Sequence, residues 1–207
     1  MKEWMVLLLP IILTGILGLF FNTKLEKQKH ILQKKIQDFS LYNERKHSSY
    51  TELYKLIKEA EGQIFGLRGL KTVPSFTDCN TQDIDNYLKE FNTPQKAITE
   101  ITHLWEKEKY DEAIQKIREY EKMRDINKAE SAFFSAKNYW LLNELYFKEE
   151  LNTKLHEYFK DLYSLYVNYE MPEGVSRKEN RELKSKINDK FDELKSIMKK
   201  ELSMFTE

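Results

Sequence analysis

Histidine and cysteine are the side chains best suited to metal binding or nucleophilic chemistry, and this 207-residue chain has few of them. They are far apart in sequence: His30, His47, His103, His156 and Cys79. Glu100 and His103 have the Glu-x-x-His spacing that places both side chains on one helix face, as carboxylate di-metal bundles require. Such a centre needs a second pair, and Thr153 occupies the equivalent position before His156. We therefore predict no metal site and no cofactor.

Other enzyme motifs are also missing from the sequence. It contains no glycine-rich phosphate-binding loop, and its serines lack the context of a nucleophile elbow. Cys79 falls in an expected loop without a neighbouring histidine that would activate its thiol. The chain is therefore predicted not to be an enzyme, and the sequence identifies no small-molecule substrate.

The charge balance bears on the class of partner. Lysine and arginine number 34, and aspartate and glutamate also number 34, so the formal net charge is zero. Nucleic-acid-binding proteins usually carry a basic excess, so we predict no nucleic-acid partner. A single cysteine cannot form a disulfide within the chain, which suits a reducing compartment.

Aromatic residues are most frequent between residues 139 and 169. About half of them are expected in a hydrophobic core. Tyrosine is a favoured anchor residue at protein interfaces, so tyrosines outside the apolar face of their helix could line a partner-binding patch. The candidate patch consists of Tyr158, Tyr163, Tyr166 and Tyr169.

An uncharged segment lies near the start of the chain. Its eighteen residues, Trp4 to Phe21, read WMVLLLPIILTGILGLFF. As a helix they would extend roughly 27 Å, close to the thickness of a bilayer core. One alternative is a cleaved signal peptide, but its apolar core is usually shorter and ends in a small-x-small site. Another is a buried soluble helix, but a helix without a polar face would need a much larger core around it. We predict a membrane anchor over residues 1–22.

Several residues of this anchor have expected roles. Aromatic residues at its two ends suit the membrane interfaces, a proline bends or tilts the helix, and a small-xxx-small pair suits helix contact. These residues are Trp4 and Phe21, Pro10, and Thr14 with Gly18.

Lysines after the segment predict its orientation. They are Lys24, Lys27, Lys29, Lys34 and Lys35, whereas only Lys2 precedes the segment. Because cations are retained on the cytoplasmic side, we predict a single-pass protein of the cell membrane, with its N-terminus outside and its C-terminal domain in the cytoplasm. The same lysines could also rest on anionic lipid headgroups.

A regular seam follows the lysines. Its positions alternate spacings of four and three: Leu32, Ile36, Phe39, Asn43, Lys46, Tyr50, Leu53, Ile57, Ala60, Ile64 and Leu67. This heptad pattern predicts a helical stalk over residues 23–70 that ends near Gly66 or Gly69. The seam could form a coiled coil between chains. We favour packing against later helices of the same chain, because those helices need partners.

Amphipathic stretches fill the rest of the chain. Helices are expected at about 81–91, from 94, from 110, from 149 and at 176–204, with Thr81 and Thr93 as caps and a break or bend near residues 125–127. Short connections between them favour antiparallel packing. We predict an all-α fold in which a transmembrane helix runs into the stalk and is followed by an antiparallel helical bundle over residues 71–207.

Two stretches resemble small uncharacterised single-pass helical membrane proteins of low-GC bacteria. They are Leu41–His47 with Tyr50, Leu53 and Tyr54, and Leu142–Leu151. The resemblance implies a bacterial cell-membrane location, and it does not indicate any particular activity. The expected function is that of a membrane-tethered adaptor, scaffold or accessory protein, whose partners are the lipid bilayer and another protein or a second copy. The alternative is a membrane-perturbing or pore-forming effector that oligomerises through its transmembrane helix.

Overall fold

The computed structural model describes residues 3–69 and 74–203, and the side chains of residues 20–69 and 74–203. These residues form six α-helices and one short 3-10 helix, and they contain no strand. The predicted all-α fold is thus confirmed. The chain divides into two units, residues 1–49 and residues 50–207.

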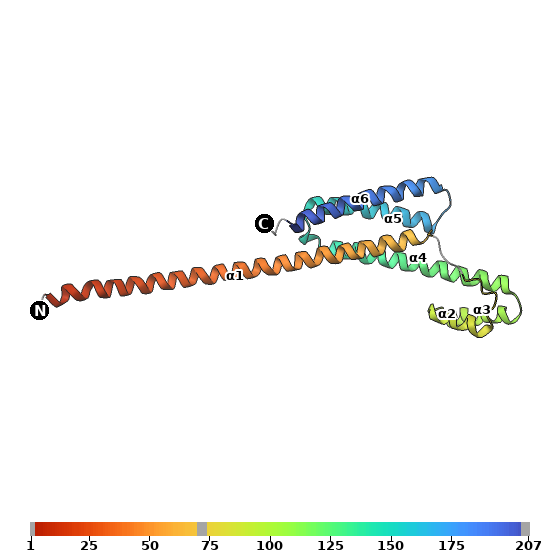
Figure 1. Cartoon of the computed structure of the whole chain (residues 1–207), viewed down its shortest axis with the longest axis horizontal. Coiled ribbons are helices and arrows are strands. Elements are labelled where there is room, and N and C mark those ends of the chain that lie inside the picture. The colour runs from red at the N-terminus through yellow and green to blue at the C-terminus, as the bar shows by residue number, and fades with distance from the viewer. Residues whose placement is uncertain (1–2, 70–73, 204–207) are drawn as a thin grey trace. The chain divides into compact units, whose positions relative to one another are not determined.

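Helix α1 (Glu3–Gly66) is continuous over 64 residues and contributes to both units (Figure 1). It ends at Gly66, one of the two glycines predicted to end the stalk. The boundary between the units falls between Ser49 and Tyr50, not at the predicted junction of residues 70 and 71. The last part of the stalk belongs to the compact unit because its apolar side chains are in that unit's core.

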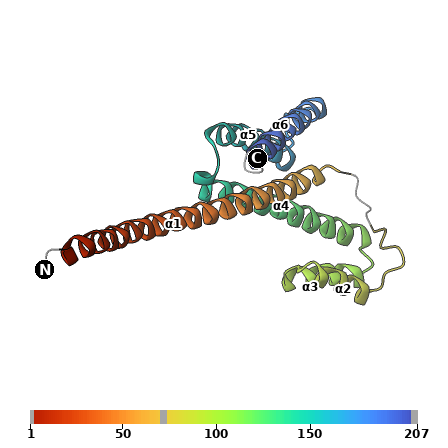
Figure 2. The same ribbon diagram turned by 60° about the vertical axis from the view of Figure 1, so that its left-hand side comes forward.

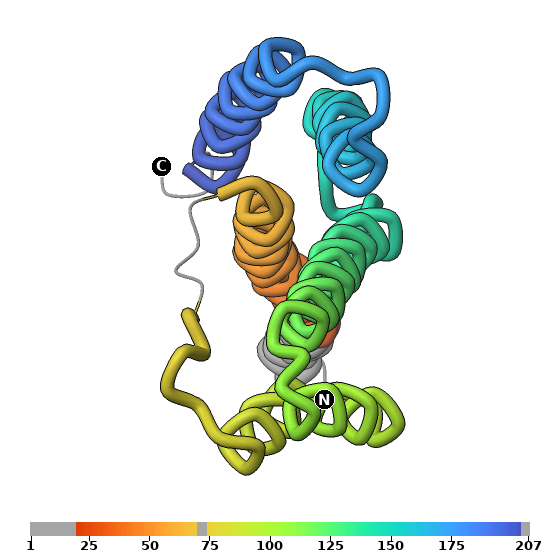
Figure 3. The backbone as a smooth tube through the Cα atoms, turned by 90° about the vertical axis from the view of Figure 1, so that its right-hand side faces the viewer, coloured from red at the N-terminus to blue at the C-terminus, as the bar shows by residue number. Residues whose placement is uncertain are grey.

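The second unit has a large core surrounded by four helical segments. They are the end of α1, the later part of α4 (Tyr110–Leu142), α5 (Glu149–Glu170) and α6 (Arg177–Ser203), seen nearly end-on in Figure 3. Its most deeply buried residues are aliphatic and aromatic side chains at helical spacing: Tyr50, Leu53, Ile57, Ala60, Ile64, Phe133, Ala136, Leu151, Leu155, Tyr158, Leu162, Leu165, Ile187 and Leu194.

Helices α5 and α6 are antiparallel neighbours. Near one end of the pair Lys154 Nζ lies 2.8 Å from Glu193 Oε1, and near the other the Asn168 amide donates to Asn180 Oδ1 at 2.9 Å. Residues early in α5 therefore contact residues late in α6. The connection over residues 171–176 contains Gly174 at φ 84°, a left-handed conformation that glycine adopts without strain.

The end of α1 is antiparallel to α6 in the same way. The Tyr50 hydroxyl donates to Glu201 Oε2, near the end of α6, whereas Lys184, near its start, lies 4.2 Å from the centre of the Phe65 ring. The predicted helical bundle is therefore present, and its core includes α1.

A smaller core lies at the beginning of α4. Helices α2 (Thr81–Glu90) and α3 (Gln95–Glu106) pack against each other, and α3 packs against α4. Figure 2 shows α2 and α3 side by side at the first part of α4. Their shared core contains Phe76, Ile84, Leu88, Ile98, Ile101, Trp105, Ala113 and Ile117.

The starts of these helices differ slightly from the prediction. The cap of α2 is Asn80, not Thr81: Asn80 Oδ1 accepts from the Asp83 backbone N–H at 3.0 Å, and the Asp83 carboxylate accepts from the Asn80 N–H at 2.9 Å. This reciprocal pair is a capping box. Helix α3 starts at Gln95 directly after Pro94, so Thr93 lies one position too early to be its cap.

Helix α4 is continuous through residues 125–127, where a break or a bend was predicted, so there is no break. The polar Asp125 and Asn127 interrupt the apolar pattern there. They do so because α4 leaves the smaller core after Tyr120 and enters the larger one at Ile126, which is only partly buried. The lapse in periodicity thus marks a gap between two cores along one helix. The 3-10 helix η1 (Glu144–Tyr146) then leads into α5.

Candidate functional site

The first candidate surface lies on α1 within residues 1–49. Four large apolar side chains there are exposed at heptad spacing: Leu25, Leu32, Ile36 and Phe39, with exposed fractions of 51%, 58%, 60% and 57%. We call these four residues the exposed stripe. Apolar side chains lined up along one helix face are the arrangement by which a helix packs against another helix.

The seam continues past this stripe into a different environment. Leu53 and Ile57 stand three heptads after Leu32 and Ile36, and both are 0% exposed. The intramolecular packing that the sequence favoured thus holds for the seam from Tyr50 onward. It does not hold for the exposed stripe.

Two polar residues separate the two parts of the seam. Lys46 is 4% exposed. Asn43 Oδ1 is shielded from solvent and accepts no hydrogen bond. A buried amide oxygen without a donor costs free energy, so this atom requires an explanation.

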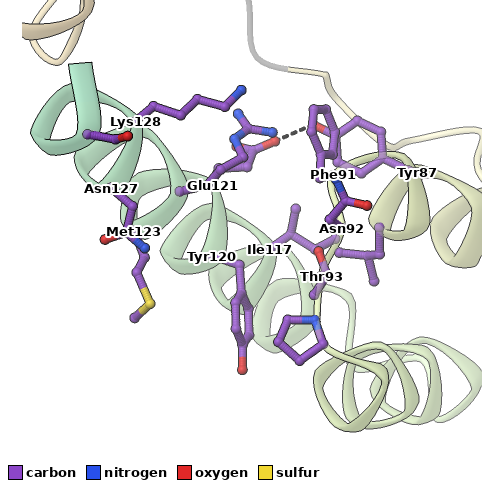
Figure 4. A pocket seen from close by; sticks show the side chains of 14 residues that line it. Tyr87, Phe91, Asn92, Thr93, Ile117, Tyr120, Glu121, Met123, Asn127 and Lys128 are labelled. Carbon is purple, nitrogen blue, oxygen red and sulfur yellow. Dashed lines mark hydrogen bonds between the residues drawn. The ribbon is translucent and has the colours of Figure 1, made fainter. Parts of the chain in front are cut away.

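The second candidate surface is a pocket of about 440 Å³ between α2 and α4, which we call the α2–α4 pocket. Figure 4 shows Ile117, Tyr120 and Met123 presented by α4, with Tyr87 and Phe91 opposite them. Asn92 has φ 54°, and this left-handed residue turns the chain after α2. The turn places Phe91 and Pro94 in the pocket lining.

Polar groups at the edge of the pocket are already engaged with one another. The Tyr87 hydroxyl donates to Glu121 Oε1 (Figure 4), and burial together with this carboxylate raises the pKa of Tyr87 well above its usual value. The Arg124 guanidinium lies 4.1 Å from the centre of the Phe91 ring and donates to Asp125 Oδ1 at 3.0 and 3.2 Å. The Glu121 carboxylate and the Arg124 guanidinium therefore both interact with neighbouring side chains of this chain.

The pocket is suited to holding an apolar group more than to chemistry. Its walls are mainly aromatic and aliphatic, and its carboxylate is occupied by a phenol.

The predicted tyrosine patch is wrong for three of its four members. Tyr158, Tyr166 and Tyr169 are buried in the large core, while Tyr163 is 44% exposed. The three lie on the apolar face of α5 together with its leucines. A tyrosine side chain can be buried when its hydroxyl has a hydrogen-bond partner. The Tyr158 hydroxyl donates to Glu61 Oε2 at 3.2 Å.

The predicted anchor is mostly outside the described side chains. The structure does not describe the side chains of Trp4, Pro10, Thr14 and Gly18, whereas that of Phe21 is described and exposed. The five lysines of the predicted topology signal, Lys24, Lys27, Lys29, Lys34 and Lys35, are all exposed. Within the part of the chain that the structure describes, no helix has the length and apolar character needed to span a membrane.

The Glu-x-x-His pair does not form a metal ligand set. Glu100 Oε1 lies 2.7 Å from Lys116 Nζ on α4, and this hydrogen bond lowers the pKa of the Glu100 carboxyl. His103 is exposed, with Nδ1 4.0 Å from Glu106 Oε2. Among the described residues, no three histidine, cysteine or acidic side chains are grouped to hold a metal ion.

The sequence reasoning missed the buried acidic residues. Glu61, Asp161 and Glu201 are all nearly inaccessible to solvent. Asp161 is held by Lys190 and Lys186, at 2.8 and 3.1 Å from its Oδ2 atom. Its position beside Leu162, between Tyr158 and Leu165 on the apolar face of α5, is the signal that could have revealed it.

Comparisons with protein-family models, with curated proteins and with solved structures return no match to this chain.

Proposed function

We propose that this protein is a membrane-tethered helical interaction protein, anchored by residues 1–22 and acting at the cytoplasmic face by binding protein. The observation that carries the proposal is the exposed stripe on α1, which begins four residues after the uncharged segment ends. An exposed row of apolar side chains indicates a surface that a partner covers.

The sequence of the first 35 residues supports the tether. Eighteen residues without a charge can cross the hydrocarbon region as a helix. The lysines that follow favour a cytoplasmic location for the rest of the chain. Their side chains are exposed, as contact with lipid headgroups requires.

Binding is favoured over catalysis by where the polar residues lie. The histidines are exposed and far apart in sequence, and Glu100 is paired with a lysine. The buried carboxylates also have partners: Glu61 accepts from Lys58 at 2.9 Å and from Tyr158, and Asp161 is held by two lysines. Such pairs explain how these charges are tolerated in the core.

Fractionation tests the tether. The full chain and a variant lacking residues 1–22 are expressed in bacteria, and membranes are washed with alkaline carbonate. We expect the full chain to remain in the membrane pellet and the shortened chain to be in the soluble extract. Full-length protein in the soluble extract contradicts the proposal. On intact cells, an external protease is expected to leave the C-terminal domain uncut.

The effector alternative has a separate readout. A membrane-perturbing protein would lower the membrane potential when it is overexpressed, and this effect would disappear with residues 1–22. A tethered binding protein is expected to leave the potential unchanged. An uncharged segment favours the second result, because a wide aqueous pore needs polar lining.

A further inference from the structure

We infer that the exposed stripe is covered by the same stripe of a second copy of this chain, in a parallel two-stranded coiled coil over residues 22–43. The inference deepens the proposed function by naming the partner, and its parallel orientation rests on the proposed anchor. Two copies that enter one membrane at their N-termini present this segment in the same direction.

The heptad positions of the segment fit two strands. If Ile36 and Asn43 occupy a positions, Leu25, Leu32 and Phe39 all occupy d positions. The exposed fractions of Leu25, Leu32 and Ile36, between 51% and 60%, leave most of each side chain available. Lys29 is the polar member of the a series, and its long aliphatic stem can cover the seam while the ammonium group reaches water.

Asn43 supplies an observation of a different kind. Its Oδ1 atom is shielded from water and accepts no hydrogen bond within the chain. An asparagine at an a position of a parallel dimer pairs with the same residue of the second helix and selects register and strand number. If the Asn43 side chain turned from its shielded position toward a second copy, Oδ1 would gain the amide donor that it lacks in the single chain.

The flanking positions are compatible with this register. In a parallel dimer each g residue lies near the following e residue of the other helix. Gln28 would then face Gln33, and Lys35 would face Ser40, so no like charges oppose each other at these e and g positions. The two copies of Lys29 meet at an a position, where each ammonium group must reach water. Lys27 and Lys34 fall at f positions, on the side away from the second helix.

The chain itself limits the length of the pairing. From Tyr50 onward the a and d side chains are buried within the same chain, so a second helix cannot use them. Lys46, the d position after Asn43, is also only 4% exposed, so pairing must end between Asn43 and Lys46.

Cysteine cross-linking of the full chain in detergent micelles tests the pairing. In a Cys79→Ser background, single cysteines are introduced as Leu25→Cys and Ile36→Cys on the stripe, with Lys34→Cys on the opposite face and Ile57→Cys in the core as matched controls. After oxidation, we expect about tenfold more linked dimer for the two stripe variants than for either control, because a disulfide needs close Cβ atoms. Equal linkage at all four positions, or none on the stripe, overturns the inference.

The same variants report orientation. Residues 25 and 36 are about 16 Å apart along a helix. An antiparallel pair brings identical positions together only near its crossing point, so it cannot link both. Linkage at both positions supports the parallel dimer, and linkage at one alone overturns it.

The contribution of the anchor is separated by Gly18→Leu, which removes the small-xxx-small pair with Thr14. Linkage of Ile36→Cys that persists in this variant supports pairing through the stripe. Linkage that is lost assigns association to the anchor and overturns the inference. Full-length protein that stays in the membrane pellet but forms no disulfide-linked dimer would count against the pairing alone. Full-length protein in the soluble extract would count against the membrane anchor.

The role of Asn43 has its own test. Asn43→Leu is expected to give species larger than a dimer, measured by the mass of the protein in the micelle, since the residue that selects two strands is gone. Gln37→Leu at an exposed b position is the matched control and should stay dimeric. A dimer of unchanged mass with Asn43→Leu contradicts the assigned role.

Discussion

The two parts of the α1 seam contain the same types of residue but differ in solvent exposure. Leu32 and Ile36 are 58% and 60% exposed, while Leu53 and Ile57, three heptads later, are 0% exposed. The difference does not come from the helix, which is continuous through both parts. It comes from α4, α5 and α6, whose side chains share a core with the later part. A heptad pattern therefore states which face of a helix is apolar, and other elements decide what covers it.

The largest expected effect comes from shortening a seam residue in the buried part. Ile57→Ala removes methyl groups from the bundle core and should cost about 2–5 kcal/mol of unfolding free energy. For a chain of this size each kcal/mol lowers Tm by roughly 2–4 °C. Thermal unfolding followed by near-ultraviolet circular dichroism measures the change. A shift no larger than that of Ile36→Ala would break the comparison.

A smaller loss of stability is expected from a change at Asp161, which links α5 to α6 through ion pairs. Burial opposes ionisation of Asp161, but hydrogen bonds from Lys190 and Lys186 outweigh it and lower the pKa of this carboxyl below its usual value. Asp161→Asn should cost about 1–3 kcal/mol at pH 7, because both lysines lose their charged acceptor.

The lowered pKa of Asp161 also predicts how its contribution to stability changes with pH. A carboxyl with a lowered pKa in the folded state stabilises the fold above its unfolded pKa, near 4, and this contribution is lost as pH falls through the folded value. The wild-type chain should therefore lose more stability than Asp161→Asn between pH 5 and about pH 2. Parallel pH profiles of Tm for the two proteins would contradict this assignment.

The hydrogen bond between Tyr158 on α5 and Glu61 on α1 should contribute less to the free energy of unfolding. Burial and the nearby Glu61 carboxylate raise the pKa of Tyr158, which keeps its hydroxyl a donor to Glu61. Tyr158→Phe removes this donor and should cost about 1 kcal/mol, since Lys58 still binds the carboxylate. Tyr163→Phe is the matched control, because this phenol is partly exposed. Equal Tm values for the two variants would show that the Tyr158–Glu61 hydrogen bond does not stabilise the packing of the later seam against α5.

The smallest effect on the bundle is expected from the exposed stripe. Ile36→Ala should change the unfolding free energy of the bundle by less than about 0.5 kcal/mol, the usual range for exposed positions. The same substitution should reduce disulfide linkage through Leu25→Cys in the Cys79→Ser background. A large fall in Tm with unchanged linkage would reverse the assignment of the two seam parts.

Periodicity was sufficient for much of the fold. The all-α class, the end of α1 at Gly66 and the extents of α5 and α6 follow from apolar spacing and from glycine and proline positions. The continuous α4 could not be predicted in this way, because its polar stretch near Asp125 resembles a helix end. That stretch spans the gap between two cores, which only the packing of other helices creates.

The candidate sites were less accessible to sequence reasoning. The lysines after the uncharged segment could be named from charge alone. Tyr158, Tyr166 and Tyr169 were predicted to line a partner-binding patch because tyrosine is a favoured interface residue, and the structure buries all three in the large core, where the Tyr158 hydroxyl donates to Glu61. The α2–α4 pocket depends on Phe91, Tyr120 and Met123, which are far from contiguous in sequence and meet through a turn at Asn92.

The sequence by itself determined that this chain forms long helices, which face of each is apolar and where several of them end, because these properties depend on residues within one or two turns. Only the tertiary structure decided that the α1 seam is buried from Tyr50 onward and exposed from Leu25 to Phe39. Burial depends on which distant helices arrive at a face, and spacing along one helix contains no information about them.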